Sequence, residues 1–174
     1  LASASDDGTV AIHDYRVDGQ NGKNKVIAEI SDAHNRPHSV VWNPLSENEI
    51  MTAGHDDKIF TFDIRQGTQP LVSFHGHVPS NSRCKKIHHP IFFNPCSNMT
   101  NSEQFILTGG DGSRSLSMFR NKNSERSKEQ PISVYSRGKL PADCGDAGSL
   151  ATQGKRVAAV VDGGEILLLT PQIK

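Results

Sequence analysis

The chain has 174 residues with 19 basic and 19 acidic side chains, so its formal net charge at neutral pH is zero. This length suits one ordinary domain and is too short for two. A neutral chain has no overall field that would draw it to a nucleic-acid backbone or an anionic membrane, so local patches must select its partners.

The three cysteines, Cys84, Cys96 and Cys144, have no Cys-x-x-Cys spacing, which indicates a reducing compartment rather than a disulfide framework. The first residues contain no basic and apolar signal segment, and no apolar run approaches the roughly 20 residues of a membrane-spanning helix. These features predict a cytoplasmic or nuclear protein with no membrane partner.

Along the chain, one hairpin pattern occurs four times. Each copy has a short strand of apolar or small residues, a turn rich in Asp and Gly, and a second strand of alternating or continuous apolar residues. The first copy, LASASDDGTVAIHDYR, aligns with the second, IMTAGHDDKIFTFDIR, without a gap, and both end in Asp-x-Arg. The four copies are residues 1–16, 50–65, 106–120 and 158–169. We therefore interpret the chain as a repeat protein.

Two further kinds of strand lie between the hairpins. One ends in Asn-Pro, because proline cannot donate to the next ladder position, and it occurs at 37–44 and 88–95. The other precedes it, at 25–30, 70–75 and 131–136. No window of about a dozen residues has the i, i+3, i+4, i+7 spacing of an amphipathic helix. The pattern predicts an all-β protein with four strands in each repeat and no long helix within residues 38–118.

The repeat resembles that of WD-repeat proteins, whose units of roughly 40 to 45 residues have four strands, an early Gly-His and a late Trp-Asp. Gly76-His77 and the weaker Ala33-His34 occupy the early position. The late position has no tryptophan and is filled by His13-Asp14, Phe62-Asp63, Phe119-Arg120 and Leu169-Thr170. The resemblance implies a partial β-propeller of about three and a half four-stranded antiparallel blades, with Trp42 buried between blades.

The same resemblance sets the expected blade boundaries. The first, partial blade covers residues 1–31, and the others cover 32–75, 76–136 and 137–174. We expect the chain to be the C-terminal part of a longer propeller. In such a part, unpaired sheet edges and exposed inter-blade faces invite association.

In the family, the early histidine, a Ser or Thr on the second strand, the turn aspartate and the tryptophan form a hydrogen-bonded chain inside a blade. The resemblance implies an architectural role for these positions, because buried polar groups need partners far more often than they act as catalysts. Phe62 has no indole donor for such a chain. In the second repeat the positions are His34, Thr52, Asp56 and Phe62, and the equivalents in neighbouring repeats are Asp7 and His77.

The sequence offers no support for a catalytic, metal or cofactor site. Its eight histidines include no His-x-x-x-His on a helix, and no cysteine pair accompanies them. A Gly-x-Ser-x-Gly nucleophile motif is absent, and the glycine-rich segment 108–115 lacks the Gly-Lys-Ser/Thr ending of a phosphate-binding loop. We therefore predict a protein that is not an enzyme and takes no metal, cofactor or small-molecule substrate.

Basic residues gather at 82–86 and in part of 120–130. Both runs are short, and neither interleaves the aromatic side chains of a base-stacking surface. They are typical of solvated loops. A reader of nucleic acid or chromatin is therefore the least favoured function.

The second hairpin, residues 50–65, closely resembles the box by which many WD-repeat proteins act as substrate receptors of cullin-RING ubiquitin ligases, and residues 1–16 fit it nearly as well. The resemblance implies an adaptor contact in which the arginines meet acidic or carbonyl groups. The residues implied are Asp14, Arg16, Asp63 and Arg65. Most of the box also describes any well-formed WD hairpin, so the alternative is a cargo or complex-assembly scaffold with no ligase link.

Overall fold

A computed structural model of the chain describes residues 1–18, 24–78, 87–94, 104–109, 115–121, 136–139 and 146–170. Every regular element among these residues is a β-strand, and no helix occurs among them. The described residues thus hold no helix that is long and apolar enough to cross a membrane. The all-β prediction is confirmed for this part of the chain.

The strands form separate antiparallel sheets in which neighbours along the chain are neighbours in the sheet. The first sheet contains β1 (Ala2–Ala4), β2 (Thr9–Asp18) and β3 (Asn24–Ser31). The second contains β4 (Pro37–Trp42), β5 (Glu49–Gly54), β6 (Lys58–Asp63) and β7 (Val72–His75). The third contains β8 (Ile91–Phe93), β9 (Phe105–Gly109), β10 (Ser115–Arg120) and β11 (Ser136–Lys139). The fourth contains β12 (Ala147–Gln153), β13 (Arg156–Val161) and β14 (Ile166–Leu169).

Two strands differ from the sequence-based expectation. A strand was expected at 131–136, whereas β11 starts at Ser136 and residues 131–135 lie outside the described part. No residue range was predicted for β12, which pairs with β13 from Ala147 to Gln153 across a register shift. Its sequence, AGSLATQ, has too few large apolar residues for alternation to reveal it. The neighbouring strand β13 has most of the apolar residues of this hairpin.

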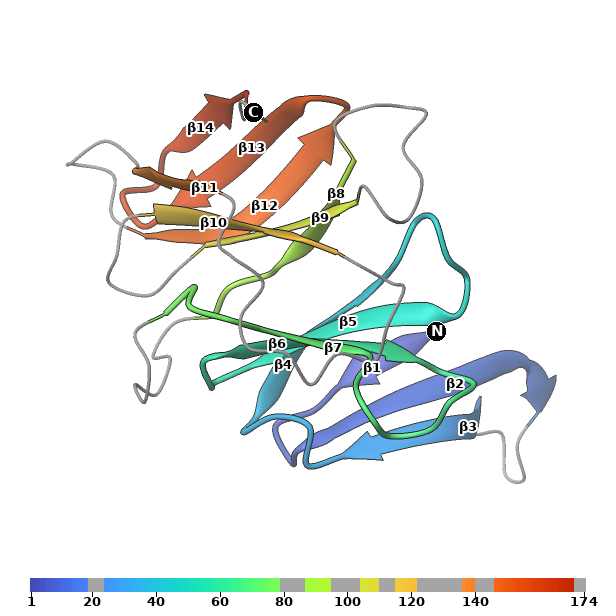
Figure 1. The fold of residues 1–174 in the computed structure, drawn as a ribbon. Coiled ribbons are helices and arrows are strands. Elements are labelled where there is room, and N and C mark those ends of the chain that lie inside the picture. Colours follow the sequence, from blue (N-terminus) through green and yellow to red (C-terminus); the bar gives the residue numbers. More distant parts are fainter. Residues whose placement is uncertain are drawn as a thin grey trace.

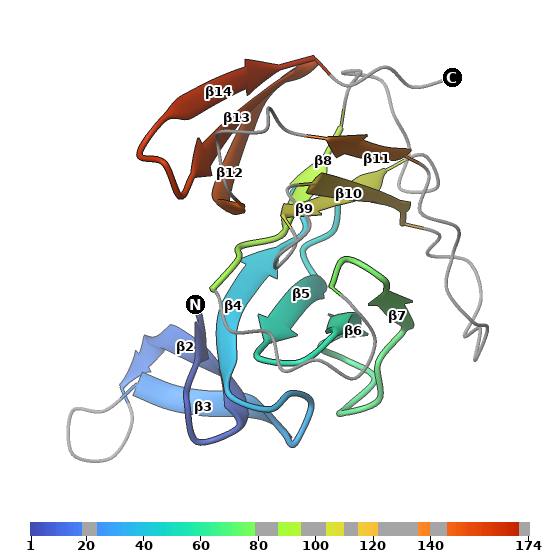
Figure 2. The same cartoon turned by 90° about the vertical axis from the view of Figure 1, so that its left-hand side faces the viewer.

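The four sheets follow one another in chain order, from the first at the bottom of Figure 1 to the fourth at the top. The first and second sheets meet where β4 lies against β1 and β2, and the third and fourth sheets meet where β12 lies against β8 and β9 (Figure 2). The blade boundaries expected from the sequence stay a prediction, because nothing in this arrangement of sheets requires a ring.

Apolar side chains fill the space between each sheet and the next. Separate clusters join the first to the second sheet, the second to the third, and the third to the fourth. Consecutive residues of a strand point to opposite faces, so Phe92 packs toward the second sheet and Phe93 toward the fourth. Strands β5 and β9 are buried at every residue for the same reason, because both faces of their sheets are covered.

Trp42 departs from its expected environment. It ends β4, opposite Ile50, and packs against the cluster between the first and second sheets. Its side chain is half-buried rather than buried, because this end of the interface opens into a cavity that Trp42 lines.

Candidate functional site

The hairpins of the first two sheets define two opposite edges. Strand β6 begins at Lys58, directly after the turn that contains Asp56, and ends at Asp63, just before Arg65. Six extended residues separate these ends by roughly 20 Å. We call the edge with the turn residues 5–8 and 55–57 the turn edge, and the edge with residues 14–16 and 63–65 the arginine edge.

At the arginine edge, each arginine holds the aspartate two residues before it. Arg16 donates from Nε to Asp14 Oδ1 at 3.0 Å and from Nη2 to Oδ2 at 3.2 Å. Arg65 repeats the geometry on Asp63, with distances of 3.0 and 2.8 Å. The backbone N–H of each arginine also donates to the same carboxylate. The Asp-x-Arg spacing therefore forms the same two-point clamp in both sheets.

The clamp leaves the positive group outside. The side chains of Arg16 and Arg65 are 76% and 66% exposed, whereas those of Asp14 and Asp63 are 18% and 9% exposed. The bonds from Arg65 lower the pKa of Asp63 to about 2, and the bonds from Arg16 also lower the pKa of Asp14. Both carboxylates are therefore ionised at neutral pH, and each anchors a guanidinium that faces solvent.

A cavity joins the two hairpins at this edge. Its volume is about 200 Å³, and its lining includes Asp14, Tyr15 and Arg16 from the first hairpin and Ile64 from the second. Because one cavity reaches both hairpin ends, the two Asp-x-Arg sequences lie on the same edge of the molecule.

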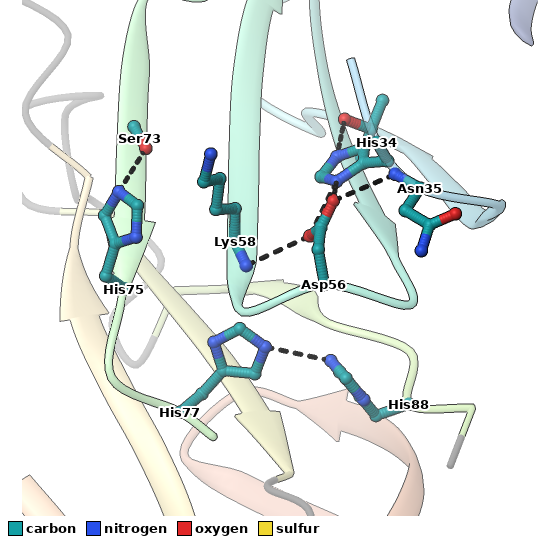
Figure 3. A network of polar contacts seen from close by, with 9 residues as sticks. His34, Asn35, Asp56, Lys58, Ser73, His75, His77 and His88 are labelled. Atoms are coloured by element: carbon teal, nitrogen blue, oxygen red, sulfur yellow. Dashed lines mark hydrogen bonds and ion pairs between the residues drawn. The ribbon is translucent and has the colours of Figure 1, made fainter. Parts of the chain in front are cut away.

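At the turn edge, the structure brings together three of the side chains assigned by the family resemblance. His34 Nδ1 lies 3.0 Å from both carboxylate oxygens of Asp56, and His34 Nε2 lies 2.8 Å from Thr52 Oγ1 (Figure 3). A carboxylate only accepts, so Nδ1 is the donor. Gly54 makes room for the histidine, because a Cβ at that position would lie 2.5 Å from His34 Cβ.

Asp56 also accepts hydrogen bonds from backbone N–H groups of two neighbouring segments. The N–H of Asn35 donates to Oδ2 and the N–H of Lys58 donates to Oδ1, each at 3.1 Å. Burial raises the pKa of Asp56, but the hydrogen bond and charge of His34 and the two backbone donors outweigh burial and leave the pKa lowered. The carboxylate thus ties the loop before β4 to the β5–β6 turn.

The other assigned residues lie apart from this network. Phe62 is buried in the apolar cluster between the first and second sheets, and the ring that contacts His34 is that of Phe60, at 4.8 Å between centroids. Phe60 and Phe62 are two residues apart on β6 and therefore face the same side of the sheet, with ring centroids 5.9 Å apart. Asp7 accepts from the N–H and hydroxyl of Thr9 within its own turn.

His77 belongs to a histidine cluster that the sequence analysis did not predict. Its Nε2 lies 3.0 Å from that of His88, and both side chains are buried (Figure 3). The ring of His38 lies 5.5 Å from that of His88, 5.2 Å from His55 and 6.1 Å from His89. Burial and the neighbouring histidines lower the pKa of His77 to about 3 and that of His38 to about 4.

A buried amide and carboxylate cluster joins the second and third sheets. Asn43 exchanges two hydrogen bonds with Gln104, both 2.7 Å, and donates to Glu49 at 2.7 Å. Asn121 donates to Gln104 and to Glu49. The sequence signal was the Asn-Pro that ends β4, which was interpreted only as a strand stop.

Several sequence-based expectations concern residues outside the described part. These are the three cysteines, the basic run at 82–86 and residues 122–130 of the second basic loop. In the described part, no group of three or more His, Cys, Asp or Glu side chains has an arrangement that could hold a metal ion.

No protein-family model and no curated protein matches the chain. Among solved structures, it is similar to one described as the crystal structure of the computationally designed Ika4 protein, with a TM-score of 0.60 and 15% sequence identity. The similarity covers 97% of this chain and 83% of that chain. At this identity the likeness concerns the fold alone and supports the all-β architecture.

Proposed function

We propose that the protein is a non-catalytic WD-repeat interaction scaffold, with its four sheets as consecutive blades of a partial propeller, and that it serves as a substrate receptor for a cullin-RING ubiquitin ligase. One observation carries this proposal: two successive sheets present an exposed arginine on an aspartate clamp at the same position of their hairpins. An arginine held in this way reaches a partner with little loss of side-chain freedom and offers planar, charge-assisted hydrogen bonds.

The clamp also has a purely local use, because it satisfies the Asp14 and Asp63 carboxylates at the ends of their strands. A local role requires no exposed guanidinium, since the backbone N–H groups and Gln66 already donate to Asp63. Presentation of both guanidinium groups on one edge therefore favours a partner that binds across the two hairpins.

The test is co-purification of a purified cullin-RING ligase adaptor with the full chain. The Arg16→Ala/Arg65→Ala variant is expected to lose adaptor binding by at least tenfold, while Arg36→Ala keeps it. Arg36 is a matched control, because it is also exposed and also pairs with an aspartate, Asp6, but lies at the turn edge. Adaptor binding that is absent in the parent, or equal in the double variant, contradicts the receptor proposal and leaves a scaffold without a ligase link.

A further inference from the structure

The cavity at the arginine edge has a mixed lining, in which the apolar surface is larger than the polar surface of His13, Asp14 and Arg16. Ile12, Ile27, Trp42 and Ile64 line it, from three strands of the first two sheets and the residue that follows β6. Ile12 is buried, whereas Ile27 remains 53% exposed. The cavity therefore brings apolar surface from both sheets to a single opening.

Backbone geometry sets Ile27 apart from its neighbours on β3. Ile12 pairs with Ala28 and His13 pairs with Val26, so Ile27 is the extra residue of a β-bulge. Bulges re-aim side chains and recur beside binding sites. Here the bulged residue lines the cavity, whereas the adjacent Val26, which is 46% exposed, does not.

Size restricts the occupant. Pockets for small-molecule ligands measure roughly 300 to 1,000 Å³. A volume of about 200 Å³ is smaller, and suits one or two side chains of a bound chain. The part of the wall formed by Ile12, Ile27, Trp42 and Ile64 favours an apolar side chain, because a polar one placed there would lose its water without gaining a partner.

The charge of Arg16 restricts which residue of the partner can lie beside that apolar side chain. Arg16 lines the same cavity, and its clamp uses only two of the five N–H donors of the guanidinium. The Asp14 carboxylate is largely covered, so the exposed charge at the rim is positive. A carboxylate one or two residues from the apolar side chain lies within reach, since an extended chain advances about 3.3 Å per residue.

We propose that this cavity binds a partner peptide through one apolar side chain, with a neighbouring Asp or Glu on Arg16. The inference rests on the proposed function, because it describes what the arginine edge of the scaffold recognises. A phosphate backbone is a poorer fit, since the chain has no net positive charge and the larger part of the cavity wall is apolar.

To test this, peptides that bind the full chain are selected from a library of random heptapeptides. The affinity of the selected peptides is then measured with fluorescently labelled copies. Enriched peptides are expected to carry Leu, Ile, Met or Phe within two residues of Asp or Glu. Binding should fall at least tenfold in Ile27→Glu and in Arg16→Ala, and stay within twofold in Val26→Glu. No enriched motif, a motif without the apolar residue, or equal loss in Val26→Glu would overturn the proposal.

Two further measurements separate this inference from the proposed function. Arg65 does not line the cavity, so Arg65→Ala should weaken adaptor binding yet leave peptide binding within twofold. Peptide binding without adaptor binding supports the cavity and contradicts the ligase link, whereas adaptor binding that survives Ile27→Glu overturns the cavity. A labelled single-stranded oligonucleotide that binds in place of the peptides, with a steep salt dependence, also overturns it.

Discussion

The Nε2 atoms of His77 and His88 lie 3.0 Å apart in the interior, so one imidazole donates to the other. This contact needs at least one neutral ring, because two imidazolium ions would bring two donors and two charges together.

We predict that stability falls as pH is lowered from about 6.5 to about 4. The pKa of His77 is lowered to about 3 and that of His38 to about 4, both below the ordinary 6.5. In this window the unfolded chain binds more protons than the folded chain, so unfolding becomes easier at a rate of about 1.4 kcal/mol per pH unit for each histidine. Urea unfolding at pH 7.5, 6 and 5 measures the slope.

Replacing both His38 and His77 should reduce the dependence of the free energy of unfolding on pH. The His38→Gln/His77→Gln variant is expected to lose most of the pH dependence above pH 5, where the carboxylates stay ionised. His13→Gln serves as the control, because His13 bonds Ser3 in the first sheet and does not belong to the cluster. If the free energy of unfolding of the wild-type protein is equal at pH 7.5 and pH 5, His38 and His77 are not held neutral in the folded state.

Asp56→Ala should lower the free energy of unfolding by about 1–3 kcal/mol. The substitution leaves His34 Nδ1 and the N–H groups of Asn35 and Lys58 without their acceptor, and the His34 donor, which is partly buried, is costly to leave unpaired. Asp57→Ala is the matched control in the same turn. Equal midpoints of chemical unfolding for the two variants would remove Asp56 from the architecture of the second sheet.

Gly109→Ala should lower the free energy of unfolding by at least about 1–3 kcal/mol, because it disturbs the contact between the third and fourth sheets. A Cβ at Gly109 would lie 1.9 Å from the carbonyl oxygen of Ala147, so backbone must move. At Gly148 the nearest atom to a Cβ is 3.5 Å away, an ordinary contact. Thermal unfolding of Gly109→Ala beside Gly148→Ala tests the packing, and similar melting temperatures would refute it.

Gln104→Leu should cost about 1–3 kcal/mol, because it removes three hydrogen bonds of buried Asn43 and Asn121 and leaves these amides with fewer partners. Gln153→Leu makes the same chemical change on an exposed residue at the end of β12. Chemical unfolding of the two variants isolates the buried cluster. If Gln104→Leu is as stable as wild type, the cluster does not hold the second and third sheets together.

The outer face of the fourth sheet should promote self-association at high concentration. Ile166 and Leu168 on β14 are 68% and 79% exposed and share one face with Val160. Contiguous exposed apolar residues on a sheet favour association. Leu168→Lys is expected to shift sedimentation profiles toward monomer, whereas Leu45→Lys, at an exposed loop position, should not. Identical profiles for both variants would contradict an adhesive face.

Period-two alternation, Asp-Gly turns and the Asp-x-Arg endings are local properties, and they sufficed to predict an all-β chain and most of its strands. Each depends on residues within a single hairpin, where backbone geometry relates sequence spacing to position. The clamp of Arg65 on Asp63 likewise needs only a two-residue spacing, and the family pattern grouped His34 with Thr52 and Asp56.

The contacts between sheets could be identified only from the tertiary structure. Asn43 and Gln104, or His38 and His88, lie in different repeats, and their approach depends on how one twisted sheet packs on the next. The cavity arises in the same way, from a bulge at Ile27 that meets Trp42 and Ile64 of the neighbouring sheet. A pattern within one hairpin carries no information about such distances, because they are determined by the summed packing of side chains far apart in the chain.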